Sequence, residues 1–416
     1  MLSIDTRMAW RNLWRNPRRT VLTILAVAFA CVLLVFMLSF QFGSYETMIN
    51  ASVRIHTGHL QVQAQGYQEN QEIRRVIADP EPVRAALDAI AEVAAHAPRA
   101  RAFALVSSAD RTYGVMVEGI DPAAEARVST LAEIVRQGRY LADAPAEEGL
   151  PGALVGDLLA RNLRVSVGDE LTVLGQGRDG SIAATVLRVA GIYNSGMDEF
   201  DRRAVQMPLA VFQETFAMGS AVHEIVVVGR RLGDAGGIAK SLENRLASLP
   251  TEHPLAVLDW AALMPGLRQA IYMDLAGGIV FYLVLVMVVA FSILNTFLMA
   301  ILERTHEFGI MMAMGVKPGR LTRLVLTESA GMTLVGVVAG IMLGGLVTGY
   351  FALHGIDLGT PEMSRQFGIP STLYPRLSLL SMTAGPLLVL AVTLLAALYP
   401  ALKIRRLAPV AAMRQR

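Results

Sequence analysis

Four long apolar segments without a charged residue constrain the fold of this chain more than any other feature. They cover residues 20–40, 276–302, 329–352 and 377–402. A helix that crosses the hydrocarbon core of a bilayer needs about 20 apolar residues at 1.5 Å rise per residue. Each segment reaches that length and exceeds an ordinary core helix. The sequence therefore predicts four transmembrane helices.

In the short segments that flank the predicted spans, most arginine and lysine residues lie on one side of the membrane. They precede the first span, separate the second from the third and follow the fourth, as Arg7, Arg11, Arg15, Arg18, Arg19, Arg304, Lys317, Arg320, Arg323, Lys403, Arg405, Arg406, Arg414 and Arg416. The loop 353–376 carries only Arg365 and Arg376. An excess of basic residues in short loops marks the cytoplasmic side. We therefore expect cytoplasmic termini, a cytoplasmic 303–324 loop and an outward-facing segment 42–272.

This pattern predicts an α+β membrane protein in which a large α+β domain is inserted between helices 1 and 2. In chain order we expect an amphipathic N-terminal helix at 1–19, a first span at 20–41, an outer domain at 42–272 with a β-rich subdomain near 150–210, a second span at 273–302, a short helix and loop at 303–324, a third span at 325–352, an outer loop at 353–376, a fourth span at 377–402 and a tail at 403–416. Hydrophobic periodicity also predicts a helix over 80–97 and a helix that starts at Asp259 and continues into the second span.

The stretch NTFLMAILERTHEFGIMMAMG, residues 295–315, joins the second span to a short amphipathic segment. Glu303 and Glu307 are spaced one turn apart, so on a single helix they would share a face and could pair with basic groups of a partner. Three apolar side chains, Phe308, Met311 and Met312, would offer an adaptable surface. We expect Gly315 and Pro318 to end this helix. The alternative is a basic loop lying on lipid headgroups.

Several function classes lack their motifs in this sequence. No G-x-x-x-x-G-K-[ST], G-x-S-x-G or H-E-x-x-H string occurs. The single cysteine, Cys31, lies in an apolar run, and no Cys/His spacing suits a metal. The net charge of +2 gives no general attraction to nucleic acid. We therefore expect no catalytic residue, no metal and no nucleic-acid partner.

The chain resembles the FtsX/MacB/LolCE superfamily of ABC-transporter permeases, the type VII or mechanotransmission transporters. The resemblance rests on AWRNLWRNPRRTVLTIL at the start, IHTGHLQVQAQGY at 55–67, VGDLLARNLRVSVGDELTVL at 155–174, AGIYNSGMDEFDRRAVQMPL at 190–209, ERTHEFGIMMAMG at 303–315, Glu328, and YPALKIRRLAPVAAMR after the fourth span. It covers essentially the whole chain and is closest to the lipoprotein-releasing LolC/LolE branch.

The resemblance implies a permease subunit in the bacterial inner membrane, with the large domain in the periplasm. Its expected partners are a cytoplasmic ABC ATPase dimer, a second permease subunit in a homodimer or heterodimer, and a periplasmic carrier or adaptor protein, all acting at the lipid bilayer. ATP and Mg²⁺ would bind the ATPase and not this chain. The implied function is lipoprotein or lipid release from the inner membrane. The alternatives are a MacB-like exporter of peptides or small amphiphiles and an ATP-independent receptor or sensor.

The resemblance also implies roles for particular residues. The ATPase-coupling set is Glu303, Arg304, Glu307, Phe308, Gly309, Met311, Met312 and Gly315. Ser292, Asn295 and Thr296, together with Phe40 of the first span, are predicted to line a substrate cavity or to make helix contacts. Gly336, Gly340 and Gly344 are spaced for close helix packing, either within one subunit or across a dimer.

Overall fold

The computed structural model describes residues 11, 14–15, 17–142, 149–247, 253–357 and 372–403. The chain divides into two compact units. We call the described residues up to 45 and from 270 onward the helical unit, and residues 46–269 the sheet domain. Most of the predicted helix at 1–19 and all of the predicted tail after Lys403 fall outside the described residues, and residues 17–19 belong to the first long helix.

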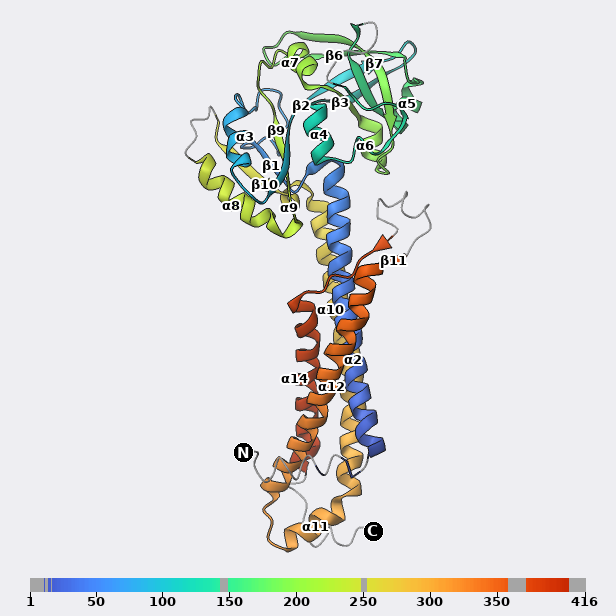
Figure 1. Cartoon of the computed structure of the whole chain (residues 1–416), viewed down its shortest axis with the longest axis vertical. Coiled ribbons are helices and arrows are strands. Elements are labelled where there is room, and N and C mark those ends of the chain that lie inside the picture. Colours follow the sequence, from blue (N-terminus) through green and yellow to red (C-terminus); the bar gives the residue numbers. More distant parts are fainter. Residues whose placement is uncertain are drawn as a thin grey trace. The chain divides into compact units, whose positions relative to one another are not determined.

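Four long helices form the helical unit and run alongside one another (Figure 1). They are α2 (Pro17–Ser52), α10 (Pro265–Glu303), α12 (Pro318–His354) and α14 (Leu379–Lys403). Within the described residues, these four are long and apolar enough to cross a membrane. The four predicted spans are therefore confirmed as helices. Three of them have 36 to 39 residues, well beyond what the bilayer core requires.

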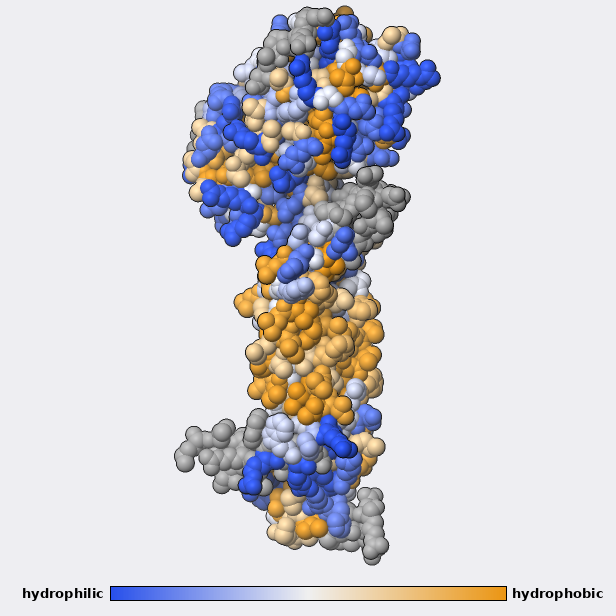
Figure 2. Space-filling model, turned by 45° about the vertical axis from the view of Figure 1, so that its right-hand side comes forward, coloured by the Kyte–Doolittle hydropathy of each residue, from blue (hydrophilic) through white to orange (hydrophobic). Residues whose placement is uncertain are grey.

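Apolar side chains cover the outside of the helical unit as well as its interior. Figure 2 shows them as an apolar belt across the visible face of the helices, with polar residues beyond it toward the connection of α10 to α12. Leu346 is 70% exposed and Phe291 is 64% exposed, whereas Val27, Cys31 and Val389 are buried between the helices. A helix that is apolar all round needs an apolar surrounding on every side, and a lipid bilayer supplies one.

A ten-stranded sheet organises the sheet domain. Its strands follow the order β10-β1-β9-β2-β3-β8-β5-β7-β4, and β6 pairs with β2 and β7. They are β1 (Leu60–Ala64), β2 (Val93–Ser107), β3 (Thr112–Ile120), β4 (Val135–Gly138), β5 (Gly152–Gly156), β6 (Glu170–Gln176), β7 (Ile182–Tyr193), β8 (Ala204–Pro208), β9 (Glu224–Gly229) and β10 (Leu255–Asp259). The strands near 150–210 thus belong to the same sheet as the rest of the domain.

Short helices cover this sheet and complete two hydrophobic cores. They are α3 (Glu81–Asp88), α4 (Pro122–Val128), α5 (Asp157–Leu163), α6 (Asp198–Arg203), α7 (Leu209–Thr215) and α8 (Ala235–Leu246). The helices α3 and α8 bury Leu87 and Leu242 with Val62 and Ile225 of the sheet. A second core lies under β2, β3 and β5–β8, where Phe212 of α7 packs. In the helical unit, β11 (Ile356–Asp357) pairs with β12 (Thr372–Leu373).

Two sequence predictions about helices are wrong. The predicted helix over 80–97 ends at Asp88, and β2 begins at Val93 because residues 93–99 pair with β9. The predicted helix from Asp259 into the second span is interrupted at Met264, which separates α9 (Trp260–Leu263) from α10. Met264 has φ −124° and ψ 66°. A residue that precedes proline, here Pro265, is disfavoured in the helical conformation.

Candidate functional site

The connection from α10 to α12 contains a short separate helix, α11 (Thr305–Ala313). Arg304 lies between α10 and α11 with φ −100° and ψ 7°, and therefore breaks the helix. Glu303 ends α10 and Glu307 lies in the first turn of α11. The prediction that Glu303 and Glu307 share one helix face is therefore wrong.

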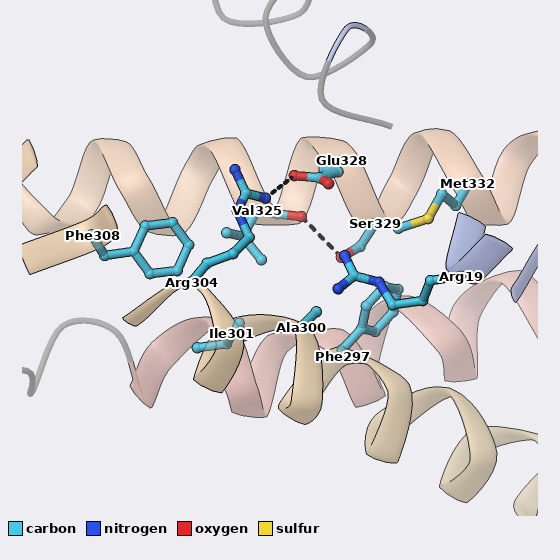
Figure 3. A pocket seen from close by; sticks show the side chains of 10 residues that line it. All are labelled: Arg19, Phe297, Ala300, Ile301, Arg304, Phe308, Val325, Glu328, Ser329 and Met332. Atoms are coloured by element: carbon cyan, nitrogen blue, oxygen red, sulfur yellow. Dashed lines mark hydrogen bonds and ion pairs between the residues drawn. The ribbon is translucent and has the colours of Figure 1, made fainter. Parts of the chain in front are cut away.

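Arg304 joins α11 to α12. Its Nη1 donates to Oε2 of Glu328 at 3.1 Å, and its Nε donates to Oε2 of Glu307 at 3.3 Å. The guanidinium also lies 5.4 Å from the centre of the Phe308 ring. Figure 3 shows Arg304 reaching from the end of α10 to Glu328 on α12. Because Glu328 is buried, this arginine satisfies a carboxylate that would otherwise lie unpaired away from water.

Two arginines at the start of the chain extend this arrangement of charges. Arg19 of α2 pairs with Glu303 at 3.3 Å, and Arg15 hydrogen-bonds to Glu307. Arg15, Arg19, Glu303, Arg304, Glu307 and Glu328 together form what we call the helical-end cluster. Glu303 and Glu307 thus pair with this chain's own arginines, whereas the sequence suggested pairing with a partner.

The environment of Glu307 fixes its charge state. Partial burial by itself tends to raise the pKa of this carboxyl group. The hydrogen bonds and positive charges of Arg15 and Arg304 outweigh burial and hold its pKa below the usual range. Glu307 is therefore ionised at neutral pH, and the start of α11 is held by charge pairs to both neighbours.

A small pocket lies beside the helical-end cluster. Arg19, Arg304 and Glu328 line its polar side, and Phe297, Ala300, Ile301, Phe308, Val325, Ser329 and Met332 supply the rest of the wall. Figure 3 shows that these side chains come from α2, α10, α11 and α12. The pocket therefore lies where α2, α10 and α12 meet α11.

The apolar residues of α11 face in two directions. Phe308 is fully buried against Leu321, Val325 and Ala401, and Met311 and Met312 are half-buried beside this core. The predicted apolar partner surface is therefore wrong for Phe308, which anchors α11 to the helical unit, while the half-buried Met311 and Met312 contact the same core. Gly309 is also buried.

The opposite side of α11 is exposed. His306, Ile310, Ala313 and Met314 lie there at helical spacing, and we call them the exposed face of α11. Ile310 is 43% exposed and Met314 is 72% exposed. The i, i+4 spacing of Ile310 and Met314 was visible in the sequence, but it does not reveal which side of the helix is buried. Gly315, with φ +94°, follows α11, whereas Pro318 begins α12 and does not end α11.

The predicted polar residues of the second span lie partly on an exposed face of α10. Ser292 and Asn295 are exposed, while Thr296 donates its hydroxyl to the Ser292 carbonyl within the helix at 2.9 Å. Phe40 of α2 is half-buried and stacks on Phe36 with ring centres 6.2 Å apart. The structure does not bring Phe40 into contact with the three polar residues.

The glycines of the third span pack against α2 of the same chain. A Cβ atom at Gly336 would lie 2.8 Å from Cβ of Val27, and at Gly344 it would lie 3.1 Å from Cβ of Val35. At Gly340 the added Cβ would overlap with Cys31. These glycines let α12 and α2 approach closely, so the helix they serve is α2 of the same subunit.

The described geometry defines a membrane protein with four apolar helices, a large α+β domain between the first two, and a short amphipathic helix held by charge pairs after the second. Comparison with known families agrees. Residues 20–244 match the MacB-like periplasmic core domain, and residues 279–409 match the FtsX-like permease C-terminal family. The chain belongs to the FtsX-like permeases with a MacB-like periplasmic core domain, and is an ABC-transporter permease of the FtsX/MacB/LolCE type.

Individual relatives fit this family. The lipoprotein-releasing system transmembrane protein LolC of Xylella fastidiosa is 24% identical over 94% of this chain and 92% of its own length. LolE of Haemophilus influenzae is 25% identical over 74% of both chains. The pyoverdine export ATP-binding/permease protein PvdT of Pseudomonas syringae is 25% identical over 80% of this chain but 50% of its own length. The solved periplasmic region of MacB from Actinobacillus actinomycetemcomitans aligns with 53% of this chain and 97% of its own, at 10% identity and a TM-score of 0.37.

Proposed function

We propose that this chain is the membrane subunit of an ATP-binding-cassette complex in the bacterial inner membrane. A separate cytoplasmic ATPase binds its α11 side, and ATP hydrolysis there changes the conformation of the sheet domain in the periplasm. The distribution of arginine and lysine supports this orientation. The transported substrate class is lipoprotein or lipid, released or extruded from the inner membrane.

The observation that carries this proposal is the two-sided character of α11. One side is fixed by Phe308 in a buried core and by Arg304, Glu307 and Glu328 in charge pairs. The other side presents Ile310 and Met314 to solvent. A short helix that is anchored on one side and apolar on the other suits docking into a groove of a partner. Methionine suits such a groove because its side chain adapts to irregular shapes.

The lipoprotein-releasing relatives support the proposed substrate class. LolC aligns with 94% of this chain and 92% of its own length, and LolE aligns with 74% of both. These matches favour the LolC/LolE type of complex over a MacB-like exporter of peptides or small amphiphiles.

A second permease subunit is also part of the proposal. Ser292 and Asn295 project from the exposed face of α10, inside a segment that must cross the bilayer. A polar side chain that faces lipid is costly, and Ser or Asn groups on two helices can hydrogen-bond to each other. We therefore expect α10 to face a second permease subunit or the substrate path between two subunits.

Copurification tests the proposal directly. The full chain is solubilised in detergent from its native membrane, and the proteins and lipids bound to it are identified by mass spectrometry. We expect an ATPase with a G-x-x-x-x-G-K-[ST] motif in stoichiometric amount. A chain that copurifies with no such ATPase would instead support the ATP-independent receptor.

Two variants place the contact on α11. Met314→Glu puts a charge in the centre of the proposed docking surface, and we expect roughly a hundredfold weaker ATPase binding. The matched control, Met314→Leu, keeps the apolar surface and should bind as the wild type does. Equal binding by Met314→Glu and Met314→Leu would show that the ATPase docks elsewhere.

A further inference from the structure

Several residues of the sheet domain bind the backbone at the C-terminal end of α2. The helix continues from Ser52 into a π-helical turn, Val53–Thr57, within the sheet domain. This turn has its own hydrogen bond from Gly58 N to the Val53 carbonyl oxygen at 2.7 Å. The last carbonyl groups of a helix have no partner within the helix and need one from elsewhere. Here the carbonyl oxygens of Arg54 and Thr57 accept hydrogen bonds from Thr130 N at 2.9 Å and Gln61 Nε2 at 3.0 Å.

Arg99 of β2 caps a third carbonyl group, that of His56. Its Nη1 donates to the carbonyl oxygen of His56, and its other nitrogens bind Glu125 of α4. The two bonds to Glu125 run from Nε to Oε2 at 2.9 Å and from Nη2 to Oε1 at 2.6 Å. A cation is favourable at the negative end of a helix, and the planar guanidinium fixes the direction of all three bonds. Arg99 therefore ties the end of α2 to both β2 and α4.

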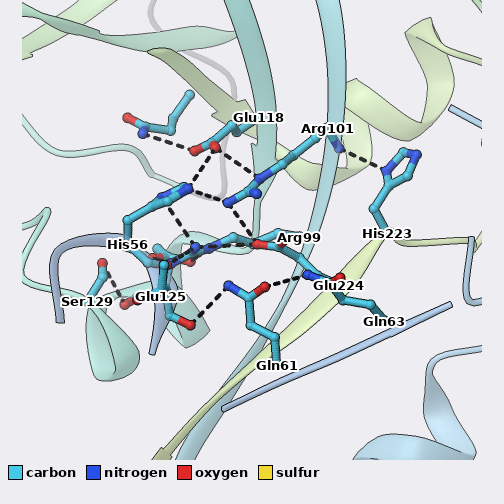
Figure 4. A network of polar contacts seen from close by, with 12 residues as sticks. His56, Gln61, Gln63, Arg99, Arg101, Glu118, Glu125, Ser129, His223 and Glu224 are labelled. Carbon is cyan, nitrogen blue, oxygen red and sulfur yellow. Dashed lines mark hydrogen bonds and ion pairs between the residues drawn. The ribbon is translucent and has the colours of Figure 1, made fainter. Parts of the chain in front are cut away.

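A second arginine surrounds this contact with further charge pairs. Arg101 pairs with Glu118 of β3 at 3.1 Å and with Glu224 of β9 at 2.9 Å, and the His56 ring lies against it. Glu118 also accepts a hydrogen bond from Gln206 of β8 at 3.2 Å. Figure 4 shows these side chains converging between the strands and the turn that carries His56. We call His56, Arg99, Arg101, Glu118, Glu125 and Glu224 the buried cluster.

The burial of these charges restricts the geometry that the end of α2 can adopt. Arg99 is 1% exposed, and Glu125 and Glu224 are 0% exposed. Removing one partner of such a pair leaves an unpaired charge without water. A conformation in which the pair is separated is therefore costly. Gly58 adds a steric limit, because it has φ +66° and a Cβ atom there would overlap with Val226 of β9.

The start of α10 is held in the sheet domain by a different set of contacts. Met264, between α9 and α10, donates its N–H to the Trp260 carbonyl at 2.8 Å, and its own carbonyl accepts from Arg268 N at 3.1 Å. The Met264 sulfur also accepts a weak hydrogen bond from the Thr57 hydroxyl at 3.6 Å. A backbone change at Met264 would break these hydrogen bonds, whereas a change at the end of α2 would also separate buried charges.

We propose that Arg99 and Glu125 are positioning residues that fix the end of α2 in the sheet domain, so that a displacement of α2 moves the sheet and is not absorbed in a linker. The role of these residues in coupling rests on the proposed function. The fixed joint, by which we mean the attachment of the end of α2 to Arg99 and Glu125, rests on the contacts above. We infer that α2 transmits movement to the sheet domain, and that the backbone at Met264 adjusts to this movement.

The first experiment measures the joint without any partner. Backbone amide hydrogen exchange at Gly58 and Thr130 is compared between wild type and Arg99→Met/Glu125→Gln in the full chain, reconstituted in lipid nanodiscs. The double substitution removes both charges together, which avoids leaving one charge unpaired. We expect exchange at these two amides to be at least about tenfold faster in the double variant. Unchanged exchange would overturn the proposal.

Two further variants serve as controls for this experiment. Arg161→Met/Asp157→Asn removes another arginine–carboxylate pair, 2.6 Å long and more exposed, on α5, and should leave exchange at Gly58 and Thr130 unchanged. Arg99→Lys keeps the positive charge but cannot donate two parallel hydrogen bonds to Glu125. It should therefore also accelerate exchange at Gly58 and Thr130, with less loss of stability than the double variant. Equal acceleration in the α5 control would mean that the domain loosens as a whole, which also overturns the proposal.

The second experiment measures coupling in the complex with its ATPase. Addition of ATP should change hydrogen exchange across residues 46–269 of the wild type, and this change should be lost in Arg99→Met/Glu125→Gln while ATPase binding and hydrolysis persist. A full ATP response in that variant would overturn the transmission role. If the wild-type chain binds no ATPase, the proposed function fails, and the exchange at Gly58 and Thr130 still decides whether the joint exists.

Discussion

The helical-end cluster and the buried cluster use the same chemistry around the end of a helix, but they differ in their access to water. In the helical-end cluster, Glu303 is 61% exposed and its pair with Arg19 is 3.3 Å long. In the buried cluster, Arg99 and Glu125 are almost completely buried and form two hydrogen bonds. Water and salt weaken exposed pairs, whereas buried pairs are costly to separate.

This difference assigns a different mechanical character to the two helix ends. The exposed pairs of Glu303 and Glu307 with Arg19 and Arg15 can exchange partners at low cost, whereas the Arg304–Glu328 pair is largely buried. The charges around the end of α2 cannot do so without exposing a buried ion. In the proposed function, the ATPase binds near α11 and the sheet domain changes its conformation. That function needs charge pairs near α11 that can rearrange, and contacts at the end of α2 that do not.

The largest expected effect comes from removing one partner inside the buried cluster. Glu125→Ala leaves the Arg99 guanidinium buried with Glu224 at 3.5 Å as its remaining close carboxylate. We expect a loss of about 3–5 kcal/mol in the stability of the chain, or a fall of roughly 10 °C in the apparent melting temperature. Thermal unfolding of the full chain in detergent measures this. Glu303→Ala in the other cluster is the matched comparison and should shift the melting temperature little.

An intermediate effect is expected at Arg304, the most buried arginine that α11 uses. Arg304→Met leaves the buried Glu328 carboxylate without its guanidinium partner at 3.1 Å. We expect destabilisation of about 2 kcal/mol, because hydrogen bonds to charged groups are worth more than neutral ones. The same thermal measurement applies. Arg304→Met/Glu328→Met should recover part of the loss, and no recovery would mean that the two residues do not act as a pair.

Acid should weaken the sheet domain through its buried histidines. Burial lowers the pKa of His223 to about 4, so the folded chain holds this ring neutral while the unfolded chain protonates it below its ordinary value of 6.5. Stability from this group is full above pH 6.5 and is lost as pH falls toward 4. Between pH 7 and pH 5 the loss is about 2 kcal/mol.

A histidine variant isolates this effect from opposing groups. Burial lowers the pKa of His56 also, but it raises the pKa of Glu224, and the two shifts act in opposite directions over this pH range. The melting temperature of His223→Gln should therefore depend less on pH than that of the wild type. An identical pH dependence in both proteins would contradict the role given to His223.

The smallest effect is expected for the exposed pair of Arg19 and Glu303. A double-mutant cycle with Arg19→Gln and Glu303→Gln should give a coupling energy below about 1 kcal/mol. Raising the ionic strength from about 0.1 M to 1 M should remove most of it, because the screening length falls to about 3 Å. A coupling energy that exceeds this value and resists salt would remove the contrast between the two clusters.

The sequence predicted the features that depend on composition and periodicity. The four spans follow from runs of apolar residues. The helix predicted over 80–97 is wrong beyond Asp88 because pairing with β9, which lies far away in the sequence, determines the conformation of residues 93–99. Local propensity carries no information about such a partner.

The candidate site shows the same limit. The sequence identified the 303–315 segment but placed Glu303 and Glu307 on one helix and put Phe308 on the outside. The helix breaks at Arg304, whose side chain contacts Glu328 of α12, and this contact exists only after α12 has packed. The buried cluster left no local signal either, because His56, Arg99, Glu125 and Glu224 are far apart in the chain.

Site-specific photo-crosslinking from Met314 tests the central claim most directly. A photoreactive residue is placed at Met314, on the exposed face of α11, and at Leu346, a position of α12 that is 70% exposed within the apolar belt. In intact cells, the probe at Met314 should form an adduct with an ATPase that carries a G-x-x-x-x-G-K-[ST] motif, and the probe at Leu346 should react with lipid or another membrane subunit. Lipid adducts alone at both positions would contradict the account.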